Sequence, residues 1–353
     1  MPDRSKTLVI LSPAFPESET PSNWVLSQQL FVKTLCEQYP DMKIVLLSFF
    51  YPQHTGSYHW HGAEVHCFDG ARARKGRRVL FWRSIWKKLN SLRRNHNVIG
   101  LFSFWCGECA LLGSWFGRLH GLPHYCWICG QDARKSNRLV RWIRPRAQEL
   151  VAMSGFLAGR FYQSHGIRPR HIIPNAIDGR QFSAAPPLQR DIDLLGVGSL
   201  EPLKQYRQFV SIVESLRHRF PSINATICGS GPEKEALEIL IKEKGLERNI
   251  RLLDRVPNPE VLQLMQRSKI LLHPSAYEGF STVCLEALYA GAQVVSFCNP
   301  LEGEIPHWHI VRHTGEMTCK TMALLQSSNG EQTPVLVYEM RHSVRAVMKL
   351  FGY

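Results

Sequence analysis

An alternation of strand-like and helix-like segments limits the fold of this chain more than any other feature. Runs such as 98–104 and 270–272 are short and apolar, and each leads toward a segment with the roughly 3.6-residue period of a helix. Strands joined by helices lie parallel in a sheet and have helices on both faces. The sequence therefore predicts an α/β fold built from doubly wound parallel sheets.

The expected elements form two series. The first has strands at 7–12, 43–50, 63–67, 98–104, 124–128 and 149–153, and helices at 23–38, 80–94, 110–120 and 156–164. The second has strands at 193–197, 224–228, 251–253, 270–272 and 293–297, and a final helix at 334–351. Ser22 is the expected N-cap of the first helix. Paired prolines and few periodic apolar positions predict a linker at 173–191, between domains at 1–172 and 192–333, with 334–353 as a separate segment.

The net charge of +14 is confined to the first half of the chain. Residues 1–170 contain 24 Lys and Arg against 10 Asp and Glu, whereas the remainder contains 19 of each kind. A basic half beside a neutral half favours an anionic surface as the partner of the first domain, either lipid headgroups or nucleic acid.

The sequence shows no segment that would carry the chain into or across a membrane. No stretch reaches the roughly 18 uninterrupted apolar residues of a spanning helix, and the first residues do not resemble a secretory signal. We therefore expect a cytoplasmic protein, free or peripheral on the inner face of the membrane, whose ten cysteines are thiols.

Two cysteine pairs allow more than one interpretation. Cys106 and Cys109, followed by Cys126 and Cys129, have the spacing of a four-cysteine zinc site. The second pair lies in an expected strand, where positions i and i+3 face opposite sides, which disfavours one shared metal. The first pair is also spaced like a thioredoxin-type redox motif. Buried, inert thiols are the favoured interpretation, and no metal site is expected.

Two carboxylates, Glu278 and Glu286, flank an expected helix start. Ser281 is a suitable N-cap, and the backbone N–H groups after it would point toward an anion such as a diphosphate. Each carboxylate can accept hydrogen bonds from the hydroxyl groups of a polyol on its side of the phosphate. The spacing therefore predicts a nucleotide-sugar site.

An ordered set of short motifs resembles a known family. The segment from His273 to Gly291 is similar to the E-x7-E region of retaining glycosyltransferases of group 1 with the GT-B fold. Upstream, Gly198 to Lys204 resembles their glycine and lysine turn. The segments 173–178 and 229–232 also resemble family motifs, in the same order. The resemblance covers about residues 172 to 295.

The resemblance implies two Rossmann-like domains facing across a cleft, with the C-terminal helix crossing back to the first domain. It implies catalytic roles for Lys204 and Glu278, and no divalent metal or other cofactor. The implied donor-binding residues are Gly198, Ser199, Gly229, Gly231, Val256, Gly279, Phe280, Ser281, Thr282, Val283 and Glu286. The implied partners are a nucleotide-sugar donor and a glycan or lipid-linked acceptor. Ser199 departs from the arginine that the family usually has at this position.

The acceptor side of the expected site lies in the first domain. Cys129 stands where relatives have a histidine, and a thiol cannot make the same hydrogen bonds. Gln131 or Asp132 is expected to contact the acceptor or the sugar instead. An equally good interpretation of Asp132 is a local turn in which its side chain binds the neighbouring backbone.

The segment 80–94 has an amphipathic pattern with two interpretations. Trp82, Ile85, Trp86, Leu89 and Leu92 share one helical stripe, and Arg83, Lys87, Lys88 and Arg94 lie outside it. Such a helix is typical of binding to an anionic membrane surface, through Trp82, Trp86 and the basic residues. A helix that packs its stripe on a sheet has the same period.

Two other classes of function remain open from the sequence. A dinucleotide-dependent oxidoreductase would explain the alternating elements, but Lys234 stands at the third glycine position after Gly229 and Gly231. A basic nucleic-acid-binding protein would explain the charge but not the paired carboxylates, so no nucleic acid is expected as a partner.

Overall fold

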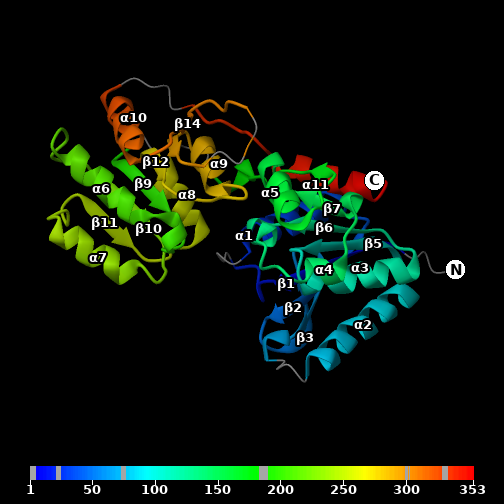
Figure 1. Cartoon of the computed structure of the whole chain (residues 1–353). Helices are drawn as coiled ribbons and strands as arrows, with labels where there is room; N and C mark the ends of the chain where they lie inside the picture. Colours follow the sequence, from blue (N-terminus) through cyan, green and yellow to red (C-terminus); the bar gives the residue numbers. More distant parts are fainter. Residues whose placement is uncertain are drawn as a thin grey trace. The chain divides into compact units, whose positions relative to one another are not determined.

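The computed structural model describes residues 5–20, 25–72, 77–182, 190–298, 301, 303–327 and 333–353. It divides the chain into two compact units (Figure 1). The first unit contains residues 1–175 and 340–353, and the second contains residues 176–339. The C-terminal helix α11 (Met340–Leu350) therefore belongs to the first unit, where it packs on helix α1 (Leu26–Gln38).

The first unit contains an eight-stranded sheet in the order β3-β4-β2-β1-β5-β6-β7-β8. Only β3 is antiparallel to its neighbour, and the remaining pairs are parallel. The strands are β1 (Lys6–Ala14), β2 (Lys43–Tyr51), β3 (Thr55–Trp60), β4 (Ala63–Phe68), β5 (Asn97–Phe104), β6 (His124–Ile128), β7 (Leu150–Ala152) and β8 (His171–Ile172).

Helices cover both faces of this sheet because successive strand residues point to opposite sides. Leu101 of β5 packs in one core with helix α2 (Arg78–Asn95) and helix α3 (Glu108–His120). On the other face, Phe31 of α1 stacks on Phe102 with 5.5 Å between ring centroids. Further helical segments are α4 (Val140–Ile143), α5 (Gly155–His165), η1 (Gly70–Arg72), η3 (Gly130–Ala133) and η4 (Ala147–Glu149).

The apolar stripe of α2 faces the sheet. Ile85, Leu89 and Leu92 are buried in the core of the first unit, and Trp82 and Trp86 are partly buried against it. Trp82 Nε1 donates to Glu108 Oε2 at 2.7 Å, and the Trp86 ring meets Phe116 edge to face at 5.1 Å. Of the two interpretations of this stripe, the structure therefore shows packing on α3 and the sheet. Arg83 and Lys87 lie on the exposed side, and Lys88 is half-buried.

The second unit contains a six-stranded parallel sheet in the order β11-β10-β9-β12-β13-β14. Its strands are β9 (Ile192–Val197), β10 (Ala225–Cys228), β11 (Ile250–Leu253), β12 (Ser268–His273), β13 (Gln293–Ser296) and β14 (Trp308–Ile310). Its helical segments are η5 (Gly179–Gln181), η6 (Pro202–Lys204), α6 (Tyr206–Arg217), α7 (Lys234–Glu243), α8 (Asn258–Gln266), α9 (Thr282–Tyr289) and α10 (Thr314–Gln326). Chain order reverses between β9 and β12, the position where open α/β sheets bind ligands.

The predicted α/β class with two doubly wound parallel sheets is confirmed. The principal strands agree with the expected ranges to within a few residues. Strands β3, β8 and β14 were not predicted, since they are short edge strands with little apolar pattern. The final helix begins at Met340 rather than at residue 334, and α1 begins at Leu26. The expected cap Ser22 lies outside the described residues.

All ten cysteines are free thiols. Burial raises the pKa of the Cys109, Cys126 and Cys129 thiols well above the usual value. Redox chemistry needs a thiolate, which this environment disfavours. In the part of the chain that the structure describes, no group of three or more His, Cys, Asp or Glu side chains is placed to hold a metal ion. Within the same residues, no helix has both the length and the apolar character to cross a bilayer.

Candidate functional site

The carboxyl ends of β9, β10 and β12 meet at one edge of the second unit. The loops that leave these strands begin with Gly198, Gly229 and Pro274. The loops after β9 and β10 are held together by backbone hydrogen bonds. Gly198 N–H donates to the Cys228 carbonyl at 3.1 Å, and Leu200 N–H donates to the Ser230 carbonyl at 2.9 Å.

The glycines in these loops are required by close packing. Gly198 has a φ of +154°, which other residues rarely adopt. A Cβ atom on Gly229 would lie 1.8 Å from the Gly198 carbonyl oxygen, and one on Gly231 would lie 2.5 Å from the Leu200 carbonyl oxygen. Close packing of the two loops by itself accounts for the glycines at 229 and 231. Ser199, in the loop after β9, is exposed.

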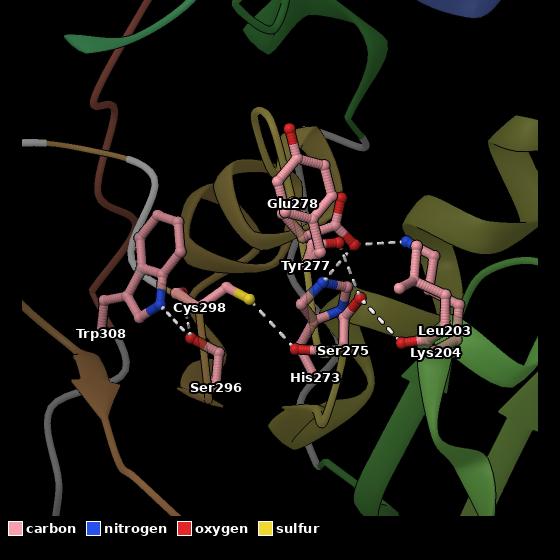
Figure 2. A network of polar contacts seen from close by, with 9 residues as sticks. All are labelled: Leu203, Lys204, His273, Ser275, Tyr277, Glu278, Ser296, Cys298 and Trp308. Atoms are coloured by element: carbon pink, nitrogen blue, oxygen red, sulfur yellow. Dashed lines mark hydrogen bonds and ion pairs between the residues drawn. The ribbon is translucent and has the colours of Figure 1, made fainter. Parts of the chain in front are cut away.

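Lys204 and His273 converge on one carboxylate oxygen of Glu278 (Figure 2). Lys204, at the end of η6, forms an ion pair with Glu278 Oε1. His273, the last residue of β12, contacts the same oxygen through Nε2 at 2.9 Å. Because an ionised carboxylate only accepts hydrogen bonds, His273 Nε2 must be the donor. The predicted pair Lys204 and Glu278 is thus brought together with a histidine.

The two partners keep Glu278 ionised. Burial by itself raises the pKa of this carboxyl, but the hydrogen bond from His273 and the charge of Lys204 outweigh burial and bring the pKa to about 2. Within the described residues, no hydrogen bond reaches the second oxygen, Oε2. The structure therefore has a charged carboxylate with one oxygen held by the protein and one left to accept a ligand hydroxyl.

A chain of polar contacts supports the loop that carries Glu278 (Figure 2). The Ser275 hydroxyl lies 3.4 Å from the Leu203 carbonyl oxygen and 3.2 Å from that of Tyr277. The Ser275 carbonyl accepts from the Cys298 thiol at 3.1 Å. Further along, the Ser296 hydroxyl donates to the Cys298 carbonyl at 2.9 Å, and Trp308 Nε1 donates to Ser296 at 2.8 Å. These contacts join the loop to β13, β14 and η6.

The start of α9 differs from the expected cap. Ser281 stands at the predicted N-cap position, which is confirmed, but its side chain makes no capping hydrogen bond. The residue is 2% exposed, and its backbone has the angles φ −101° and ψ 81°. The Ser281 carbonyl instead accepts from the N–H of Cys284 at 3.2 Å. Gly279, Phe280, Thr282 and Val283 surround this turn, which opens the eight-residue helix.

Glu286 lies in the second turn of α9 and is half-buried. In the described chain its carboxylate makes no hydrogen bond or ion pair. Burial raises its pKa to about 7, because the charged form has lost water without gaining a partner. The Glu286 carboxylate would therefore be stabilised by any ligand that offers it hydroxyl donors.

Val256, the other predicted donor-binding residue in this region, is partly buried against the core that contains residues of α8 and α9.

The predicted acceptor-side residues lie together in the first unit, after β6. The Asp132 carboxylate is buried and accepts from the N–H of Cys129 at 2.8 Å. Burial raises the pKa of Asp132 to about 6, although backbone hydrogen bonds oppose this shift. The local turn accounts for Asp132. Gln131 is exposed and lines, with Asp132, Trp105 and Asn137 among others, a pocket of about 340 Å³.

The role of His273 was not predicted from the sequence. It was quoted only as part of a motif, although a histidine at a strand end, five residues before Glu278, is a usable signal. Only the structure shows that the His273 ring lies against the Glu278 carboxylate.

Comparison with known proteins agrees with this geometry. Residues 180–305 match the family of glycosyl transferases group 1. The glycogen synthase of Mycobacterium tuberculosis (strain H37Rv) is 27% identical over 177 residues, which is 49% of this chain and 43% of that protein. The chain therefore spans less than half the length of this curated relative.

Solved structures resemble the whole chain. Sucrose-phosphate synthase from Thermosynechococcus elongatus superposes with a TM-score of 0.69 at 13% identity, over 99% of this chain and 95% of that one. Anabaena Alr3699/HepE in complex with UDP-glucose superposes with a TM-score of 0.68 at 16% identity, over 97% and 94%. Together with the two parallel-sheet units, these likenesses show that the chain has the GT-B fold. Within its second unit, residues 180–305 are similar to the glycosyl transferases group 1 family.

Proposed function

We propose that this chain is a retaining glycosyltransferase that moves a sugar from a nucleotide-sugar donor to a glycan or lipid-linked acceptor without a metal ion. The observation that carries the proposal is the convergence of Lys204 and His273 on Glu278 at the ligand-binding edge of the second unit. The family match and the UDP-glucose bound by Alr3699/HepE support a nucleotide-sugar donor.

Each part of the donor has a matching group. Glu286 accepts hydrogen bonds from the ribose hydroxyls, which favour its charged form. Lys204 and the backbone amides around the start of α9, at 281–283, bind the diphosphate. Glu278 Oε2 accepts from a hydroxyl of the sugar. Ser199, Gly198 and Val256 contribute backbone and small side chains along the donor.

The transfer step needs charge stabilisation at the leaving group. The bond between the anomeric carbon and the diphosphate oxygen breaks, and the acceptor oxygen bonds to the carbon on the same face. The acceptor hydroxyl gives its proton to the leaving phosphate. Lys204 stabilises the negative charge that develops on the phosphate, a role that metal ions have in other enzymes. Donor binding must draw Lys204 at least partly away from Glu278.

The first unit is proposed to bind the acceptor. The pocket after β6, which is lined in part by Gln131 and Asp132, is the candidate contact region. Cys129 precedes these two residues in the chain but does not line the pocket. Because Asp132 is engaged with the backbone, Gln131 is the better candidate for a direct contact.

Release of nucleoside diphosphate from a panel of sugar donors tests the proposal. K204A and E286A should lose most of the release while remaining folded. K242A and E243A change exposed residues of the same two types on α7 and serve as matched controls. Unchanged release in both K204A and E286A would reject the assigned roles.

The oxidoreductase alternative finds no support in these comparisons. The glycines at 229 and 231 are explained by loop packing rather than by a dinucleotide fingerprint. A thermal-shift panel separates the two classes, because UDP or GDP should stabilise a transferase whereas NAD should not.

A further inference from the structure

The first unit carries an exposed surface with unusual composition, formed by α3, α4 and the turn that follows α4. We define the α3–α4 surface as Trp115, Leu119, Arg141, Trp142, Arg144 and Arg146. Trp142 is 64% exposed, Leu119 is 67% exposed and Trp115 is 38% exposed. All three arginines are exposed as well. We propose that the α3–α4 surface docks on an anionic lipid bilayer.

These residues are held next to one another by Arg118. Its guanidinium donates from Nη1 to the Ile143 carbonyl at 3.0 Å and from Nη2 to the Arg144 carbonyl at 2.8 Å. This ties the last turn of α3 to the end of α4, and the two helices lie side by side (Figure 1). Trp115 and Leu119 are one turn apart on α3 and therefore share a face. The apolar groups and the arginines thus lie on two helices that are in contact.

The charge of this region is not neutralised locally. Residues 77–149 contain 14 Lys and Arg but only three acidic residues. Each of the three acids is already engaged. Glu108 pairs with Arg78 and Trp82, Glu149 pairs with Arg118, and Asp132 is buried against the backbone of Cys129. The basic residues on the surface are therefore available to an external anion.

The apolar side chains select lipid among anionic partners. Tryptophan concentrates at the boundary between headgroups and acyl chains, and leucine gains free energy by entering the apolar layer. On the adjacent α2, Val79 and Leu80 are 68% and 63% exposed. Nucleic acid would use the aromatic and basic groups but would leave the exposed aliphatic groups in water.

A cationic pocket adjoins the surface. It has a volume of about 620 Å³ and is lined in part by Arg118, Arg146 and Arg170. Glu149 also lines it, but Arg118 holds that carboxylate. Arg146 belongs both to the pocket and to the α3–α4 surface, so a phosphate headgroup could enter while the apolar side chains insert beside it.

Flotation of the full chain with vesicles tests the inference. Phosphatidylcholine vesicles that contain phosphatidylglycerol should carry the protein, whereas pure phosphatidylcholine vesicles should not. Binding should weaken as salt increases, because headgroup attraction is screened. The double variant L119S/W142S should bind about tenfold more weakly, and R141S/R144S should flatten the salt dependence.

Matched controls come from the second unit. Ile239 is 52% exposed on α7, and Arg248 is also exposed, so I239S and R248S should float like the wild type. Equal unfolding temperatures exclude misfolding of the surface variants. Wild-type flotation of L119S/W142S, equal flotation with neutral vesicles, or binding to RNA without flotation would overturn the inference. No donor or acceptor is present, so the result is independent of the transferase proposal.

Discussion

Gly229 lies so close to Gly198 that a Cβ atom on Gly229 would stand 1.8 Å from the Gly198 carbonyl oxygen. The two residues begin the loops after β9 and β10, which are neighbouring strands of the second sheet. Contact between these loops fixes the position of the segment 198–204. Lys204, at the end of this segment, forms an ion pair with Glu278. A packing requirement between two glycines thereby positions a proposed catalytic lysine.

The first prediction concerns G229A. The added methyl group must displace the backbone of Gly198, so the second unit should lose at least about 2 kcal/mol of unfolding free energy. Thermal unfolding measures this loss. G159A is a matched control, because a Cβ atom on Gly159 in α5 meets nothing within 4 Å and alanine favours a helix. An unfolding temperature for G229A equal to that of G159A would show that the loops separate easily.

The second prediction concerns His273. H273L removes the hydrogen bond that orients Glu278 and leaves Lys204 as the partner of that carboxylate. A hydrogen bond to a charged group contributes about 1.5–3 kcal/mol, so turnover should fall about ten- to a hundredfold. A lower turnover of the donor, together with an acid limb of the pH–rate profile that moves to higher pH, would identify a positioning role for His273. H218L changes an exposed histidine and should match the wild type. Unaltered turnover in H273L would count against that role.

The third prediction concerns Glu286 and pH. Its pKa of about 7 in the free protein means that the carboxyl is mostly protonated at pH 6 and mostly ionised at pH 8. If ribose hydroxyls bind the ionised form, nucleotide affinity should increase about tenfold between these pH values. Calorimetric titration with UDP or GDP at each pH measures the change. E286Q should bind weakly and with little pH dependence, and a wild-type affinity that is flat with pH would contradict the assignment.

The fourth prediction concerns acid stability. The pKa of Glu278 is about 2 in the folded protein, against an ordinary value of 4.5. A lowered pKa stabilises the folded state above pH 4.5, and this contribution is lost as the pH falls from 4.5 toward 2. Chemical unfolding between these limits should therefore show a steeper loss of stability in the wild type than in E278Q. E243Q, at an exposed position, should follow the wild type; an identical slope in E278Q would remove the basis for the ion pair.

Much of the architecture could be predicted because local pattern decides it. Buried parallel strands such as β5 and β12 must be short and apolar, and the helices between them must show one apolar stripe. The edge strands β3 and β14 escaped prediction because they are exposed or irregular in pattern. Within the site, the sequence indicated Lys204 and Glu278, and the structure brings the two into an ion pair.

Contacts between distant segments decided the rest. The stripe of α2 has a period that suits a membrane or a sheet equally, and only the position of Phe116 and Glu108 on α3 shows that Trp82 and Trp86 face inward. His273 became part of the site because β12 ends opposite η6. Ser281 stands at the N-cap of α9, but its buried hydroxyl makes no hydrogen bond within the described residues. Sequence alone determined the order and burial of the elements, since these follow from periodicity. Which charged and aromatic groups meet depended on the folded chain, since those distances are set by the packing of residues far apart in sequence.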